Sequence, residues 1–153
     1  VVPGERGFGL TLFSQSSYGS RELGNDWTGN SVYLWAIANA TYMSLMGPAG
    51  FFDVGSTILR RSHYAATKIA ELSGVRVDWS SGFFKEFVVN FDGTDKTVNE
   101  INEALRQRRI FGGKDLSESH VELGQSALFC VTEIHTADDI DRLVDNLKEV
   151  TAR

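Results

Sequence analysis

The sequence predicts an α/β sandwich, in which a small, largely antiparallel sheet is packed with helices. Two observations support this fold class. From residue 75 onward, short stretches of alternating apolar residues, typical of strands, are interleaved with stretches of helical periodicity. Two longer helical stretches precede them. The 153 residues, 42% of them hydrophobic, are enough for one core, so we expect residues 1–153 to form a single domain.

The first helix is predicted over residues 31–46, after a segment at 14–30 that is rich in Ser, Gly and Asn and lacks periodicity. Apolar residues cover most faces of this helix, whereas a surface helix carries one apolar stripe. We therefore expect it to be buried or to pack against a second subunit, self-association included. It is shorter than the ~20 apolar residues that a bilayer span needs, so no membrane segment is predicted.

A second helix is predicted after Gly47, which ends the first one. Pro48 suits the first position of a helix because its missing N–H would have no partner there. The helical spacing continues to about Gly74 through a set of apolar residues: Phe51, Ile58, Ala65, Ile69 and Leu72.

Three strands are expected at 75–79, 83–91 and 127–131. In the second strand, alternate residues must share one face of the sheet: Phe87, Val89 and Phe91. The third strand is an apolar run, so we expect its Cys130 to be buried. This single cysteine cannot form an internal disulfide, which fits a reducing, cytoplasmic location.

Capping signals define the last two helices. Thr97 with Glu100 forms a capping-box pattern before one helix, and Thr136 with Asp139 forms another before a clearly amphipathic helix. Between them, the glycine pair at 112–113 is followed by a predicted loop to about residue 125.

The charge balance narrows the classes of partner. A formal charge of −5 leaves no basic excess to neutralise nucleic-acid phosphates or an anionic bilayer. We therefore expect no nucleic acid and no membrane among the partners. Small molecules and other proteins are the expected partners.

The best candidate for a ligand contact is the segment 21–31, which is polar and precedes the first helix. Free backbone amides at a helix start attract phosphate, and Arg21, Asn25, Thr28 and Asn30 could contact such a group. The alternative is helix capping, with Thr28 or Asn30 accepting hydrogen bonds from the first turn. Capping is the commoner use of such residues, and both interpretations stay open at this point.

No residue is predicted to be catalytic. A Schiff-base lysine needs a lowered pKa, and no lysine has a convincing setting for one, with Lys114 the only lysine in a loop that could line a site. The three histidines lack metal-ligand spacing, so no metal site is predicted: His63, His120 and His135.

Five stretches carry a family resemblance: RGFGLTL at 6–12, LMGPAG at 45–50, HYAA at 63–66, FKEFVV at 84–89 and ALFCVTE at 127–133. In this order they resemble subunit 1 of the P-protein of the glycine cleavage system. The resemblance implies the carboxy-terminal small domain of a type I pyridoxal-phosphate fold, the aspartate aminotransferase-like class. At 24–31 the chain departs from the pattern of many members.

The resemblance also implies an activity and partners. It implies a glycine dehydrogenase (decarboxylating) that acts in glycine catabolism, binds pyridoxal phosphate, and passes the aminomethyl group to the lipoyl H-protein. The Schiff-base lysine is expected in the partner, subunit 2 of P-protein, within a hetero-oligomer. The segment 21–31 would then approach the cofactor phosphate, and the isolated fragment would be inactive.

Two alternatives remain beside this one. The chain could be the small domain of another type I pyridoxal-phosphate enzyme, such as an aminotransferase or a cysteine desulfurase. It could also be a non-catalytic module that mediates assembly. Collinear family stretches favour the glycine-decarboxylating subunit, which fold resemblance alone would not do.

Overall fold

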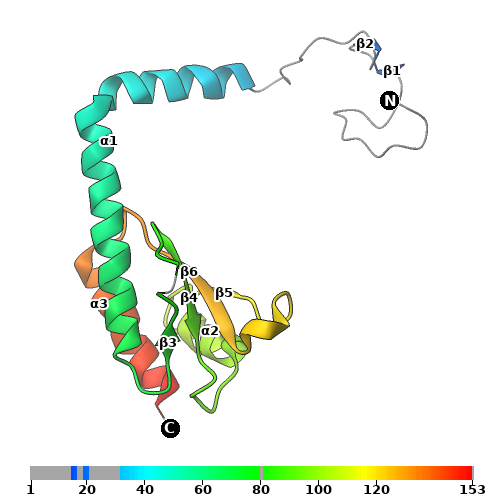
Figure 1. Cartoon of the computed structure of the whole chain (residues 1–153), viewed down its shortest axis with the longest axis vertical. Helices are drawn as coiled ribbons and strands as arrows, with labels where there is room; N and C mark the ends of the chain where they lie inside the picture. Colours follow the sequence, from blue (N-terminus) through cyan, green and yellow to red (C-terminus); the bar gives the residue numbers. More distant parts are fainter. Residues whose placement is uncertain (1–14, 17–18, 21–31, 80, 153) are drawn as a thin grey trace. The chain divides into compact units, whose positions relative to one another are not determined.

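The computed structural model of the chain describes residues 15–16, 19–20, 32–79 and 81–152 (Figure 1). The chain divides into two compact units, Val1–Gly47 and Pro48–Arg153. In the first unit, strands β1 (Gln15–Ser16) and β2 (Gly19–Ser20) pair antiparallel. The same unit holds the first part of helix α1 (Val32–Ala70), up to Gly47.

Helix α1 is interrupted where the sequence predicts a break. Gly47 has a φ of 59° and a ψ of −178°, which is not helical, and Pro48 follows it. Glycine adopts positive φ without the steric cost of a Cβ, and proline cannot donate to the preceding turn. The prediction of two successive helices is therefore confirmed.

The first part of α1 is exposed along its length. Trp35 is 69% exposed and Leu45 is 82% exposed, although both are large and apolar. Burial of this helix within the chain, one of the two expectations, is therefore wrong. Two of its hydroxyls bond within the helix, since Thr41 and Ser44 donate to the carbonyls of Ile37 and Ala40 at 2.9 and 2.8 Å.

The second unit contains a four-stranded antiparallel sheet of order β3-β4-β6-β5 (Figure 1). Its strands are β3 (Arg76–Val77), β4 (Glu86–Asn90), β5 (Lys114–Asp115) and β6 (Ser126–Cys130). Besides the end of α1, its helices are α2 (Val98–Gln107), the short 3-10 helix η1 (Val121–Leu123) and α3 (Ala137–Thr151). The predicted fold class is confirmed.

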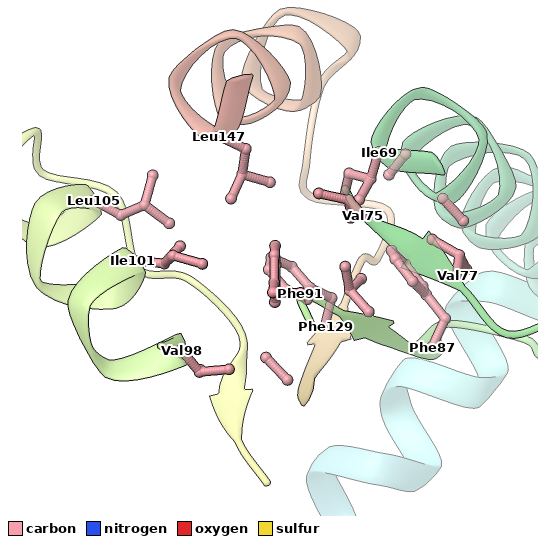
Figure 2. Packing of buried hydrophobic residues seen from close by; sticks show 14 of the residues in the cluster. Ile69, Val75, Val77, Phe87, Phe91, Val98, Ile101, Leu105, Phe129 and Leu147 are labelled. Carbon is pink, nitrogen blue, oxygen red and sulfur yellow. The ribbon is translucent and has the colours of Figure 1, made fainter. Parts of the chain in front are cut away.

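The core lies on one face of this sheet, against the helices. Phe87, Val89 and Phe91 are buried as the alternation predicts, and Phe87 pairs with Phe129 across β4 and β6. Figure 2 shows Ile69 of α1, Ile101 and Leu105 of α2 and Leu147 of α3 around these rings. Burying a large apolar side chain stabilises a fold by about 1.5–3 kcal/mol, so this layer holds the second unit together.

The other face of the sheet explains one wrong prediction. Cys130 is exposed, not buried. It ends β6 and alternates with Phe129, so it belongs to the face opposite the helical layer. An apolar run alone does not show which of its residues face outward.

Local signals placed the ends of the last two helices correctly. In α2 the backbone N–H of Glu100 donates to Thr97 Oγ1 at 3.3 Å, and the backbone N–H of Thr97 donates to Glu100 Oε2 at 2.8 Å. Thr136 and Asp139 form the same reciprocal pair in α3. Both capping boxes are confirmed.

The predicted loop at 112–125 contains two elements that the sequence did not reveal. Lys114 and Asp115 form β5 and pair with Leu128 and Ala127 of β6. Helix η1 follows a few residues later. Both are too short to produce a recognisable period, because two or three residues cannot define one.

Candidate functional site

The predicted cofactor-binding residues fall outside the residues that the structure describes. This holds for Arg21, Asn25, Thr28 and Asn30 alike, and for the family stretch at 6–12. The candidate site therefore lies in the second unit, where three of the family stretches meet.

Three consecutive residues of α1 tie the helix to two other segments. Arg61, Ser62 and His63 each donate a side-chain hydrogen bond to a backbone carbonyl at one end of the sheet. We call these three residues and their acceptors the α1 junction. It joins the family stretches at 63–66, 84–89 and 127–133, which are far apart in the sequence.

Ser62 is the buried centre of the junction. Its side chain is fully buried, and Oγ donates to the carbonyl of Phe84 at 2.6 Å, with the carbonyl of Leu59 at 3.1 Å as a second acceptor. A buried hydroxyl without a partner is costly, so this contact fixes the start of β4 against α1.

His63 combines a hydrogen bond with an aromatic stack. Its Nε2 lies 3.2 Å from the carbonyl of Phe83, and because a carbonyl only accepts, Nε2 carries the hydrogen. The ring stacks on Phe83 at a centroid distance of 4.4 Å, and Trp79 lies 6.1 Å away. In the described structure His63 therefore positions the segment before β4.

Arg61 completes the junction on its other side. Its guanidinium donates to the carbonyl of Glu133, just after β6. One turn of α1 thus holds both the entry to β4 and the exit from β6. Such an arrangement can orient neighbouring groups rigidly, but it holds no pair of titratable groups that would exchange protons.

Histidines and carboxylates elsewhere do not gather into a metal site. His120 Nδ1 lies 2.9 Å from Ser119 Oγ, and His135 Nδ1 accepts from the backbone N–H of Thr132 at 3.0 Å. Among the described residues, no group of three or more His, Cys, Asp or Glu side chains could hold a metal ion.

The lysines have ordinary surface settings in the described structure. Lys68 pairs with Glu71 at 3.8 Å, and Lys96 donates to the carbonyl of Val150 at the end of α3. Lys114 is exposed at the start of β5, whereas the sequence placed it in a loop. A lysine that forms a Schiff base is usually desolvated, and none of these three has that environment.

Surface hollows in the second unit lie away from the α1 junction. One has a volume of about 560 Å³ and is lined in part by Glu71, Thr94 and Lys148. A second, of about 500 Å³, lies between α1 and α3 beside Tyr64 and Asp141. Neither includes a residue of the α1 junction.

Four groups in the described ranges have shifted pKa values, and hydrogen bonds are the main cause in each. The hydrogen bond that Tyr64 donates to Asp141 at 2.6 Å raises the pKa of Tyr64. Donation from the Asn90 side chain, then from the Gln125 backbone, lowers the pKa of Asp92. These groups link α1 to α3 and close the turn after β4, so they stabilise the scaffold.

Sequence reasoning missed the α1 junction at Arg61 and Ser62. One signal was available for Ser62: it shares a helical face with Ala65, Ala66 and Ile69, all of which are buried. A small polar residue on the apolar face of a helix must find an acceptor, and that requirement could have identified it.

No described helix is long and apolar enough to cross a membrane.

No family model matches the sequence. Curated relatives do. The chain is 36% identical over 147 residues to a probable glycine dehydrogenase (decarboxylating) subunit 1 of Desulfitobacterium hafniense, which covers 96% of this chain and 32% of the relative. Over 150 residues it is 36% identical to the protein of the same description from Staphylothermus marinus, covering 97% of this chain and 32% of that one.

Solved structures agree with these relatives. The crystal structure of an inhibitor-bound glycine decarboxylase (P-protein) of the glycine cleavage system matches with a TM-score of 0.73 and 30% identity, over 98% of this chain and 33% of that one. A sphingosine-1-phosphate lyase from Burkholderia pseudomallei matches with a TM-score of 0.57 and 18% identity, over 71% of this chain and 23% of the lyase, which shows the fold alone. The chain spans about a third of the length of the curated relatives it matches. The predicted resemblance to subunit 1 and the type I fold are confirmed.

Proposed function

We propose that this chain is the carboxy-terminal small domain, residues 1–153, of a glycine dehydrogenase (decarboxylating) subunit 1. It helps to complete the site that decarboxylates glycine and transfers the aminomethyl group to the lipoyl H-protein. One observation carries this proposal: the similarity to subunit 1 and to glycine decarboxylase extends over 96–98% of the chain. The likeness to the sphingosine-1-phosphate lyase concerns the fold alone and so does not favour an aminotransferase or a cysteine desulfurase.

The cofactor of this function is pyridoxal phosphate, and its Schiff-base lysine belongs to the partner subunit. The bound cofactor supplies an electron sink for the carbanion that decarboxylation leaves. The described lysines support this division of labour, since Lys68 and Lys96 are engaged with Glu71 and the α3 carboxyl end while Lys114 faces solvent. This chain contributes positioning, with the α1 junction holding its sheet at a fixed place.

The segment 21–31 contacts the cofactor phosphate in the assembled enzyme. Arg21 supplies a cation, and Asn25, Thr28 and Asn30 supply hydrogen-bond donors. The segment leads directly into α1, which starts at Val32, and the first amides of a helix lack intrahelical partners. Helix capping by Thr28 or Asn30 is the competing role.

The partners of this function are subunit 2 of P-protein, the lipoyl H-protein and glycine, in a cytoplasmic hetero-oligomer. The exposed apolar part of α1 supports a protein partner there, either the other subunit or a second copy of this chain. Exposed aromatic and aliphatic residues in such number mark an interaction surface: Val32, Tyr33, Leu34, Trp35, Ile37, Tyr42, Met43 and Leu45.

The test is reconstitution. The longer protein that contains this chain is produced together with subunit 2, and exchange of labelled bicarbonate into glycine is measured with pyridoxal phosphate and lipoylated carrier. We expect exchange by the complex and none by residues 1–153 alone. Transamination of amino acids by the complex, without glycine exchange, would instead identify an aminotransferase.

A further inference from the structure

The carboxyl end of α2 is closed by an unusual residue. The backbone N–H of Arg109 donates to the carbonyl of Arg106 at 2.9 Å, and that of Ile110 donates to the carbonyl of Leu105 at 3.0 Å. This is the Schellman pattern, in which glycine usually occupies the left-handed position. Here Arg109 occupies it, with a φ of 59°, and no other described non-glycine residue has a positive φ. An L side chain is disfavoured there, so the fold gives no reason for arginine.

Two residues later, Phe111 is 89% exposed. The backbone on both sides of it is fixed. Asn102 Nδ2 donates to the carbonyl of Gly113 at 2.9 Å, and a Cβ on Gly113 would come within 2.6 Å of the Phe129 ring. Gly112 is equally confined, since its Cβ would lie 2.1 Å from Asn102 Oδ1. Phe111 is therefore presented by an ordered segment, which lowers the entropy lost on binding.

The two cations that flank Phe111 in the sequence form no ion pair with a described residue. Arg109 and Lys114 are both exposed, and neither makes an ion pair with any residue in the described part of the chain. The neighbouring Arg106 and Arg108, by contrast, pair with Glu103 and Glu149 at 3.0 and 2.6 Å. A chain with a formal charge of −5 thus has two exposed cations, without an ion pair in the described structure, within three residues of an exposed phenylalanine in the sequence.

This chemistry fits one kind of occupant. An exposed aromatic residue flanked in the sequence by two exposed cations is complementary to an acidic protein surface with an apolar recess, and such charges increase the association rate. A permanent subunit interface is broad and apolar, whereas a single aromatic anchor with charged neighbours is typical of a smaller, short-lived contact. The partner should therefore bind and leave repeatedly.

We propose that Arg109, Phe111 and Lys114, here called the α2 corner, dock an acidic carrier protein that visits the enzyme in each turnover. This inference rests on the proposed function, in which a lipoyl-bearing carrier accepts the aminomethyl group. The corner binds the body of the carrier and takes no part in the chemistry. It increases the rate at which the carrier associates and lengthens the lifetime of the complex.

The experiment uses the assembled complex of the longer protein and subunit 2. Glycine–bicarbonate exchange is measured with lipoylated carrier and, separately, with free lipoic acid as the acceptor. For Phe111→Ser we expect the KM for the carrier to rise about tenfold or more, with kcat and the rate with free lipoic acid unchanged. Val121→Ser is the matched control, because Val121 is 75% exposed and lies in η1, outside the corner.

Arg109→Gly separates docking from folding. Glycine suits the left-handed position, so this variant should unfold at a higher temperature than the wild type while its KM for the carrier rises and depends less on salt. A purely structural Arg109 would give the higher melting temperature with an unchanged KM. Unchanged carrier KM in both variants, or an equal rise in Val121→Ser, would overturn the inference.

Failure of the proposed function has a different signature. If the wild-type complex shows no exchange with either acceptor, that function is wrong. Docking is then judged by calorimetric titration of the lipoylated carrier into the complex. Weaker binding by Phe111→Ser than by Val121→Ser would support the corner, and equal binding by these variants and the wild type, or none by any, would overturn it.

Discussion

The hydroxyl of Ser62 and the carbonyl of Phe84 are joined by a 2.6 Å hydrogen bond, which links the middle of α1 to the start of β4 across 22 positions of sequence. Ser62 is fully buried, while Phe84 itself is half exposed. The bond therefore connects the core to the surface at the end of the sheet where Arg61 and His63 also bind.

Replacing Ser62 tests the α1 junction. Ser62→Ala should lower the free energy of unfolding by about 1 kcal/mol, because the Phe84 carbonyl loses its donor. Urea denaturation of the 1–153 chain measures this as a lower midpoint at unchanged slope. Ser73→Ala, at an exposed position, is the control and should leave the midpoint unchanged. Equal midpoints for the two variants would contradict a stabilising role for the junction.

The glycine at 113 is required by packing. Gly113→Ala should destabilise the fold by about 1–3 kcal/mol, since the new methyl would overlap the Phe129 ring, at 2.6 Å. Gly55 offers the opposite case, because it lies within α1 with nothing within 4 Å of an added Cβ. Gly55→Ala should be neutral or stabilising by up to about 1 kcal/mol. Melting temperatures of both variants test this difference in stability. A lower melting temperature for Gly55→Ala, with that of Gly113→Ala unchanged, would contradict the packing argument.

Relief of backbone strain at Arg109 should be measurable without any partner. Arg109→Gly is expected to raise the free energy of unfolding by about 1 kcal/mol, because the left-handed conformation penalises a Cβ. Arg109→Ala keeps the Cβ and removes the rest of the side chain, so it should not gain this stability. The urea midpoints of the two variants are compared, and a gain in both would assign the effect to the side chain beyond Cβ and not to the backbone conformation.

The capping boxes should make stability depend on acid pH. Hydrogen bonds from Thr97 lower the pKa of Glu100 below its ordinary 4.5, and those from Thr136 lower the pKa of Asp139 below 3.8. Groups with depressed pKa values stabilise the fold fully above their unfolded pKa and lose that contribution as pH falls through the folded pKa.

Glu100→Gln should therefore be less stable than the wild type at pH 7, and the difference should shrink below pH 4.5 as Glu100 protonates. Melting temperatures between about pH 2 and pH 7 give the two curves. Glu103→Gln, which breaks only an exposed pair with Arg106, controls for the loss of charge. A constant gap between wild type and Glu100→Gln across this range would argue against the cap as the cause.

The segment before α1 has two proposed roles that one double variant separates. If Thr28 and Asn30 donate to the cofactor phosphate, replacing both with alanine should weaken pyridoxal-phosphate retention by the assembled complex and leave its melting temperature unchanged. If they cap α1, each replacement should cost about 0.5–2 kcal/mol of stability and leave cofactor affinity alone. Equilibrium dialysis measures pyridoxal-phosphate retention, and calorimetry measures the melting temperature, both on the same preparation.

Elements whose signals lie within a few residues can be read from the sequence alone. The break at Gly47 and Pro48, the capping boxes at Thr97 and Thr136, and the inward face of β4 all follow from dihedral preferences, short-range hydrogen bonds or a two-residue period. The family resemblance was also readable, because its stretches keep their order along the chain.

Which of these elements contact one another, and which residues face outward, depends instead on packing between segments that are distant in the sequence. Arg61 meets Glu133 across 72 positions, Cys130 ends on the exposed face of its strand, and Lys114 joins a strand too short to have a period. Arg109 adopts a glycine conformation that its residue type disfavours. The reason is common to all four: local preferences amount to about 1 kcal/mol or less per residue, whereas packing between distant segments contributes more and overrides them.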